Sequence, residues 1–263
     1  MKKVLWLIPL VCLFFVTSCS DDTTTPTTAV NYLPTTVGSN WIFENYILDS
    51  TNSRVNASSP VIDSMVVAGT EVKLAQTATV FQHYTNTNKA GYVVGNKWYF
   101  YSANENVYVY SGLFNELLGL DKFPVKLPFT IDEKWMTLID ANNTTWNLHT
   151  KDIANDTIDY GGTKYPFSGS FKIDATKQAK EDLTIGSTKL NCQKINYLFS
   201  ISGKVKYGFF EIPITLSGNC SMWYADKVGL VKIYFQSQKL SVQGLMEQSM
   251  NGTEQNLIRY NIK

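Results

Sequence analysis

The chain has 263 residues, of which 44% are hydrophobic and 13% aromatic, and its 23 basic residues nearly balance its 22 acidic ones. A nearly neutral chain without a run of basic residues is not expected to bind nucleic acid, because phosphate binding needs a basic surface. The length is sufficient for a leader followed by one large β domain or two small ones.

Residues 1–18 show the order of features that defines a secretory signal peptide. Lys2 and Lys3 precede an apolar run, VLWLIPLVCLFFV, which is shorter than the roughly 20 residues that a membrane-spanning helix needs. The run ends in Val16-Thr17-Ser18-Cys19, which resembles the lipobox of bacterial lipoproteins. This resemblance implies that Cys19 is lipidated and becomes the mature N-terminus. A plain signal peptide with a chance cysteine is the alternative.

Residues 19–31 are expected to form a flexible tether between the lipid and the domain. The stretch SDDTTTPTTAV is polar and Thr-rich, so it cannot bury enough apolar surface to order itself. Ser20-Asp21-Asp22 resembles the acidic export signal of surface lipoproteins in Bacteroidota, with ordinary linker acidity as the alternative. The predicted location is therefore the outer membrane of a bacterial cell envelope, with or without exposure at the cell surface.

Residues 32–263 are expected to form an all-β domain. Runs rich in aromatic and β-branched residues alternate with turn residues, and no strand–helix alternation appears, which favours antiparallel pairing. A sandwich, a closed barrel and a curled half-barrel all remain open. Tight turns are expected at Gly95-Asn96, Gly161-Gly162 and Asn251-Gly252.

One short helix is expected over residues 113–120, LFNELLGL. Leu113, Phe114, Leu117 and Leu118 recur at helical spacing, and the segment interrupts the β pattern. Such a helix would place its apolar side chains over the concave face of a curled sheet.

The strand before this helix is aromatic on both of its faces. Side chains alternate along a strand, so Trp98 and Phe100 face one side and Tyr99 and Tyr101 the other. One face is expected to be core, and the other either packs under the helix or forms a ligand platform. If helix and strand enclose an apolar cavity, the ligand-binding candidates are Trp98, Tyr99, Tyr101, Phe114 and Leu117. The alternative is that they complete a solid core.

Two ten-residue segments share the pattern L-P-x-T-[V/I]-x-x-[N/K]-W-[I/M]. The first runs from Leu33 to Ile42 and the second from Leu127 to Met136. The pattern suggests two similar β units, at residues 32–122 and 123–263, in which Trp41 and Trp135 are equivalent core residues. Convergent chemistry at the start of a strand is the alternative.

Two further motifs carry a resemblance to a family. The opening Tyr32-x-Pro34-x-x-x-Gly38-x-x-Trp41 and the late WYADKVGLVK, from Trp223 to Lys232, resemble those of uncharacterised lipoproteins from Bacteroidota. The resemblance implies a β-rich extracytoplasmic domain, such as a curled half-barrel, and no particular activity. The motif residues are interpreted as structural, with Trp223 a further core residue.

Cys192 and Cys220 are the other cysteines of the mature chain and form a candidate disulfide, because the envelope is oxidising. In a simple meander the two would lie two strands apart, roughly 9–10 Å, which is too far for a bridge. Both the bridged and the reduced states remain open.

No catalytic or cofactor motif stands out in the sequence. His83 and His149 are its only histidines, neither lies in a zinc motif, and a lone strand histidine is usually exposed or hydrogen-bonded. Most of the candidate acidic residues are expected in turns, where water solvates them. They are Asp152, Asp156, Asp159, Glu181 and Asp182. We therefore expect no enzyme, metal or cofactor, but a membrane-anchored protein that binds a hydrophobic small molecule, a glycan or an envelope protein, or has a structural role. A carbohydrate-binding or carbohydrate-active surface protein is the alternative.

Overall fold

The structure is a computed structural model that describes residues 30–55, 57–86, 91–118, 131–160, 162–242 and 246–263. The predicted signal peptide, Cys19 and all but the end of the tether lie outside the described residues. One helix and fifteen strands make up the described part of the chain. In order they are β1 (Asn40–Leu48), β2 (Val61–Lys73), β3 (Gln76–Asn86), β4 (Tyr92–Ala103), β5 (Asn106–Tyr110), α1 (Gly112–Leu118), β6 (Trp135–Ile139), β7 (Thr145–Tyr160), β8 (Thr163–Lys177), β9 (Glu181–Ile185), β10 (Thr188–Tyr207), β11 (Phe210–Ala225), β12 (Gly229–Phe235), β13 (Gln238–Val242), β14 (Met246–Met250) and β15 (Gly252–Asn261).

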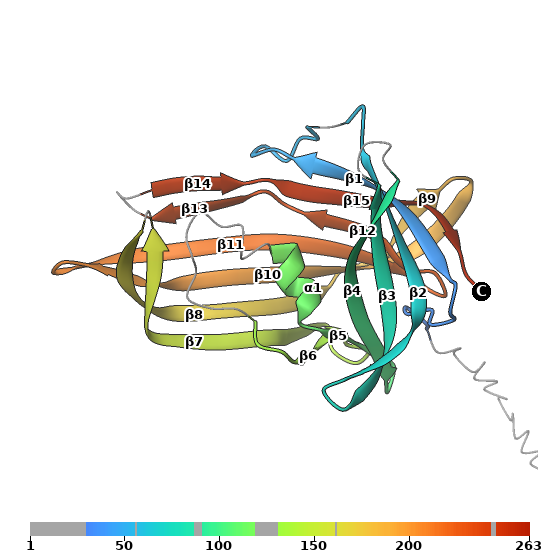
Figure 1. The fold of residues 1–263 in the computed structure, drawn as a ribbon, viewed down its shortest axis with the longest axis horizontal. Coiled ribbons are helices and arrows are strands. Elements are labelled where there is room, and N and C mark those ends of the chain that lie inside the picture. Colours follow the sequence, from blue (N-terminus) through green and yellow to red (C-terminus); the bar gives the residue numbers. More distant parts are fainter. Residues whose placement is uncertain (1–29, 56, 87–90, 119–130, 161, 243–245) are drawn as a thin grey trace, which may run out of the picture.

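All of these strands belong to a single antiparallel sheet, which confirms the predicted all-β class. The strand order is β6-β5-β4-β3-β2-β1-β15-β12-β11-β10-β8-β7, with β9 beside β10 and the β13–β14 pair beside β11. Figure 1 shows that β2, β3 and β4 cross the direction of the long strands β7, β8, β10 and β11. The sheet thereby curls around α1 into a nearly closed barrel, so that it has an inner face toward α1 and an outer face.

The two edges of the curled sheet are joined by side chains. The Nε1 of Trp146 on β7 donates to the carbonyl of Thr137 on β6 at 2.7 Å. The hydroxyl of Tyr197 on β10 crosses the interior and donates to the carbonyl of Leu138 at 2.8 Å. These bonds satisfy carbonyl groups of β6, which is an edge strand.

Two of the predicted turns are wrong. Gly95 and Asn96 lie inside the continuous strand β4, where an irregularity in the register sets Gly95 close to His83 of β3. The hairpin turns instead at Asn104 and Glu105, which have positive φ angles of 50° and 64°. Asn251-Gly252 joins β14 to β15, which do not pair with each other. A Cβ on Gly252 would lie 2.3 Å from the carbonyl oxygen of Phe235, so this glycine serves close strand approach.

The turn at Gly161-Gly162 is supported, because the ladder of β7 and β8 ends with Tyr160 opposite Thr163. Gly161 itself lies outside the described residues.

The cysteines are free and buried, so the candidate disulfide is not formed. The run from 189 to 224 folds into two long strands, β10 and β11, instead of the three expected. On this ladder Cys192 pairs with Ala225 and Cys220 pairs with Tyr197, five positions farther along β10. Five residues of strand span about 17 Å, far beyond the reach of a disulfide.

The two family-like motifs meet in space, although some 190 residues separate them. The Nε1 of the fully buried Trp41 donates to the carbonyl of Val228 at 2.7 Å. The carbonyl of Asn31 accepts from the N–H of Lys227 at 2.7 Å, and the Asn31 N–H donates to Asp226 Oδ1 at 2.8 Å. Both motifs are therefore structural, and together they attach the start of the domain to the β11–β12 turn.

The tryptophans of the proposed repeat do not occupy equivalent places. Trp41 lies on the inner face of β1 and is buried, whereas Trp135 lies on the outer face of β6 and is partly exposed. Trp223 is buried as predicted, but on the outer face, where Lys194 and Lys232 lie 4.8 and 5.3 Å from its ring centroid. Each repeated tryptophan begins or nearly begins a strand, and the unit boundaries stay a prediction.

Candidate functional site

The five predicted ligand-binding residues separate onto the two faces of the sheet. Trp98 of β4 lies on the inner face, together with Phe114 and Leu117 of α1, and Tyr99 and Tyr101 of β4 lie on the outer face. The structure therefore does not unite them in one site. The inner face can bind a ligand only if it encloses a cavity, and the outer face only if its exposed side chains form a binding surface.

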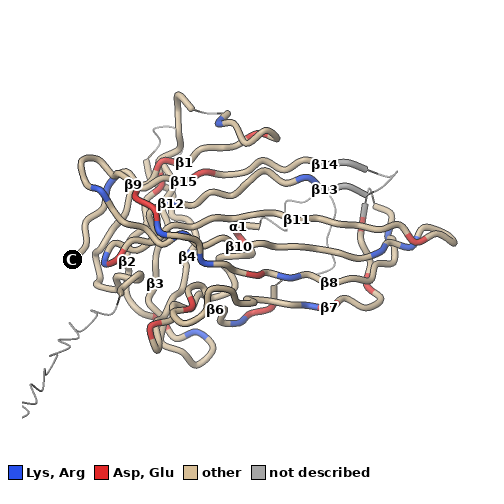
Figure 2. Tube along the Cα trace, turned by 180° about the vertical axis from the view of Figure 1, so that it is seen from behind, with Lys and Arg blue, Asp and Glu red and all other residues tan. Residues whose placement is uncertain are grey.

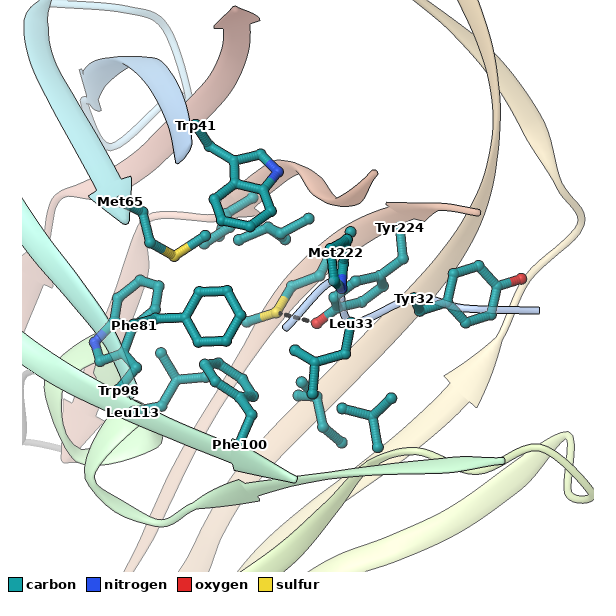
Figure 3. A pocket seen from close by; sticks show the side chains of 16 residues that line it. Tyr32, Leu33, Trp41, Met65, Phe81, Trp98, Phe100, Leu113, Met222 and Tyr224 are labelled. Atoms are coloured by element: carbon teal, nitrogen blue, oxygen red, sulfur yellow. Dashed lines mark hydrogen bonds between the residues drawn. The ribbon is translucent and has the colours of Figure 1, made fainter. Parts of the chain in front are cut away.

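The inner face beneath α1 is almost completely filled. The rings of Phe81 and Phe100 lie 5.0 Å apart, and the Trp41 ring is 5.6 Å from that of Phe81. Between them remains an apolar void of about 30 Å³. Figure 3 shows the side chains that line it, including Trp98 and Leu113.

A void of this size has room for one or two water molecules. Small-molecule sites begin at roughly 300 Å³, so the apolar cavity predicted beneath the helix is not present in the described part of the chain. The structure instead has a solid core that the helix completes, which is the alternative stated above.

Helix α1 is fixed to the sheet on both of its sides. The Phe114 ring packs against the Tyr197 ring at 5.6 Å, and Trp98 Nε1 donates to Glu116 Oε2 at 2.8 Å. The Asn115 amide pairs with the backbone of Ile131, donating to its carbonyl and accepting from its N–H. Leu113 and Phe114 are buried, as the helical spacing predicts, and Leu117 is partly buried against the core.

The outer face of β4, β5 and β6 carries a continuous aromatic cluster, which we name the tyrosine surface. The rings of Tyr101 and Tyr108, directly opposite on β4 and β5, stack with centroids 4.6 Å apart. The Trp135 ring packs edge-on against both Tyr101 at 4.8 Å and Tyr110 at 5.8 Å. All of its members are partly exposed. They are Tyr99, Tyr101, Tyr108, Tyr110 and Trp135.

Charged groups from the β2–β3 hairpin border the tyrosine surface. Lys73 Nζ lies 4.9 Å from the Tyr99 ring centroid and 5.4 Å from that of Tyr110, and the Lys73 carbonyl accepts from Trp135 Nε1 at 3.3 Å. Glu71 accepts hydrogen bonds from the Tyr99 hydroxyl at 3.0 Å and from Lys97 Nζ at 2.5 Å. The surface therefore combines aromatic carbon with hydroxyl, ammonium and carboxylate groups.

Burial and a hydrogen bond to Glu133 raise the pKa of Tyr110 to about 12. Its hydroxyl therefore keeps its proton at neutral pH and donates it to the Glu133 carboxylate.

Sequence reasoning located part of this surface. Alternation along the strand identified Tyr99 and Tyr101 as a face of their own, and the same rule applied to residues 106–110 selects Tyr108 and Tyr110. Trp135 was interpreted as core, because the pairing of β6 with β5 that brings it beside Tyr110 is not visible in the sequence.

Both histidines are buried, so of the two expected situations, exposed or hydrogen-bonded, the first does not apply to them. His83 stacks on Trp98 with ring centroids 4.1 Å apart, and burial lowers its pKa. Burial, followed by the nearby Lys134, lowers the pKa of His149 to about 4. Neither His83 Nε2 nor either ring nitrogen of His149 finds a hydrogen-bond partner among the described residues. Both rings are therefore neutral at pH 7.

The acidic residues singled out in the sequence lie on two strands, β7 and β9. Glu181 accepts a hydrogen bond from Trp223 Nε1, Asp182 pairs with Lys189 at 2.9 Å, and Asp159 accepts from the N–H of Gly162. Within the ranges that the structure describes, no three His, Cys, Asp or Glu side chains are grouped so that they could hold a metal ion.

The described residues contain no helix long and apolar enough to cross a membrane. No family model matches the sequence, and no curated protein is significantly similar to it. Among solved structures, the chain is similar to a presumed lipoprotein from Parabacteroides distasonis ATCC 8503, with 16% identity and a TM-score of 0.46 over 89% of this chain and 99% of that one. It is also similar to a presumed exported protein with a YmcC-like fold from Bacteroides fragilis NCTC 9343, with 13% identity and a TM-score of 0.46 over 88% of this chain and 99% of the other.

Proposed function

We propose that this protein is a lipid-anchored, non-catalytic binding protein of the bacterial outer membrane. It binds its ligand on the tyrosine surface, and the ligand is a glycan. The observation that carries this proposal is the contrast between the two faces of one strand. The inner aromatic residues are buried in the core, whereas the outer ones are partly exposed among polar groups.

The chemistry of the tyrosine surface suits a glycan. A sugar ring presents C–H groups on its faces and hydroxyls at its rim. The C–H groups are attracted to the negative faces of aromatic rings. The hydroxyls need hydrogen-bond donors and acceptors close by. Tyr101 and Trp135 supply aromatic surface, and Lys73, Glu71 and the tyrosine hydroxyls supply hydrogen-bonding groups.

The anchor part of the proposal rests on the leader and on Cys19, and cell fractionation tests it. The native protein should sediment with membranes and carry lipid on Cys19, and Cys19→Ala should release it or leave the leader uncleaved. Wild-type protein that is soluble and unlipidated would contradict the anchor.

The binding part is tested on an array of bacterial, plant and host polysaccharides, probed with the mature chain carrying Cys19→Ser. We expect binding to at least one glycan class and a loss of at least tenfold in affinity in the double variant Tyr101→Ala/Trp135→Ala. The matched control is Val93→Ser/Val94→Ser, which alters two exposed apolar residues elsewhere on β4. Absence of binding to every glycan, or equal binding by both double variants, would contradict the proposal.

A further inference from the structure

The turn between β10 and β11 exposes more apolar surface than any other turn in the described part of the chain. Phe209 is fully exposed at 102%, and its neighbour Phe210 is 73% exposed. Tyr207, directly opposite Phe210, is 50% exposed. Exposing two phenylalanines at a single turn is costly in water, so their position calls for an apolar environment that covers them.

The β10–β11 turn extends beyond the rest of the sheet. The β10–β11 ladder continues to the pair Tyr207–Phe210, whereas pairing of β10 with β8 stops at Val205. Gly208, with a φ of +60°, forms the tight turn with Phe209. Figure 1 shows this ribbon extending beyond the neighbouring strands at the end of the molecule. A short two-stranded ribbon with a fixed turn presents its apex without an ordering cost.

The charges lie behind the apex. Lys204 Nζ pairs with Glu211 Oε2 at 2.7 Å, and Lys206 is the other charged residue of the ribbon end. Figure 2 shows charged residues near this end of β10 and β11 and an apex without charged residues. The two lysines lie one and three residue pairs behind the last pair, Tyr207–Phe210. An apolar apex with lysines behind it suits a lipid–water interface, where the side chain of a lysine can reach the headgroups.

The distance between Asn31, at the start of the domain, and the Phe209 apex limits how the domain can lie against the membrane that holds the proposed anchor. Asn31 is bonded to Asp226, just past the end of β11, so the domain's start and the Phe209 apex lie at opposite ends of this 16-residue strand, about 50 Å apart. The 12 residues from Cys19 to Val30 are joined by 11 peptide bonds and span at most about 40 Å. A domain anchored at Cys19 can therefore bring the apex to the same bilayer only with β11 inclined along the membrane.

We infer that the β10–β11 apex inserts Phe209 and Phe210 into the interface of a phospholipid bilayer, as a second membrane contact beside the lipid anchor. The orientation part of this inference rests on the anchor proposed above, whereas insertion itself does not. Apolar burial drives the contact, so it depends little on salt or on anionic lipid.

The test uses the mature chain with Cys19→Ser, which has no anchor, so its outcome is independent of lipidation in cells. Phe209→Cys is labelled with an environment-sensitive fluorophore and mixed with phosphatidylethanolamine–phosphatidylglycerol vesicles. Cys192 and Cys220 are buried and do not compete for the label. We expect at least a twofold rise in emission, and quenching by lipids with brominated acyl chains. The same label on Val72→Cys, an exposed site on β2, should not respond.

An unlabelled assay makes the test independent of the fluorophore. In vesicle flotation, Phe209→Ser/Phe210→Ser should weaken partitioning at least tenfold, and Val93→Ser/Val94→Ser should leave it unchanged. Equal flotation of both variants, or an emission change that follows protein concentration in the absence of vesicles, would overturn the inference. The second result would assign the apex to a contact between copies of the chain.

Discussion

The inner and outer faces of β4, β5 and β6 are both aromatic, yet they are used in different ways. On the inner face, Trp98 and Phe100 pack against α1 and the aromatic rings of β1 and β3, which leaves a void of only about 30 Å³. On the outer face, Tyr101 and Trp135 pack against each other and remain partly open to solvent. Aromatic content alone therefore does not locate a binding site. The location depends on which face receives a cover.

The two tryptophans of the repeated pattern provide the largest expected contrast between the faces. Trp41→Ala removes a fully buried ring and its hydrogen bond to Val228, and should lower the free energy of unfolding by about 3–5 kcal/mol. Trp135→Ala on the outer face should cost only about 1–2 kcal/mol, because its ring is partly exposed. Urea unfolding of both variants measures this, and equal losses would remove the distinction between the faces.

Phe114 tests whether the helix is a structural part of the inner face. Phe114→Ala should cost about 3–4 kcal/mol, since the buried ring packs on Tyr197 and the filled interior cannot collapse around the gap. Differential scanning calorimetry should show one cooperative transition at a lower temperature. A loss below about 1 kcal/mol would mean that α1 is a loosely held cover over a space that can be occupied.

These differences show how far the sequence determines the structure. The period-two pattern predicted the strands and the two faces of β4, and helical spacing predicted α1, because both depend on neighbouring residues. The contact of Trp41 with Val228, the separation of Cys192 from Cys220 and the place of Trp135 were not predictable, because each depends on which distant strands pair.

The outer face also carries a buried carboxylate, that of Glu254, which pairs with the exposed Arg54 and the partly exposed Lys232. This pairing should make the stability of the protein depend on pH. Burial would raise the pKa of Glu254, but hydrogen bonds from Arg54 and Lys232, each 2.7 Å long, outweigh it and hold the pKa at about 2. A carboxyl whose pKa is lowered on folding contributes stability above its unfolded pKa, near 4.5. That contribution is lost as the pH falls from about 4.5 to 2.

Thermal unfolding between pH 6 and pH 2 should therefore show a decline below pH 4.5 that is shallower in Glu254→Gln. If the stability of the variant and of the wild type fell equally steeply with pH, the pairing of Glu254 would not determine the loss of stability in acid.

The smallest effect on stability is expected at Tyr101. Tyr101→Ala removes one partly exposed ring from the tyrosine surface and should cost about 1 kcal/mol or less. Its effect on glycan binding should be far larger than its effect on folding. Equilibrium unfolding alongside glycan titration separates the two, and a binding loss that merely follows lost stability would argue for a purely structural cluster.

The closed inner face is tested most directly by native mass spectrometry of the mature chain carrying Cys19→Ser, purified without detergent. We expect the mass of the polypeptide alone, unchanged by extraction with organic solvent. A stoichiometric adduct of lipid mass that disappears on extraction, and that is absent from Phe114→Ala, would show that the interior is occupied and that the inner face is not closed.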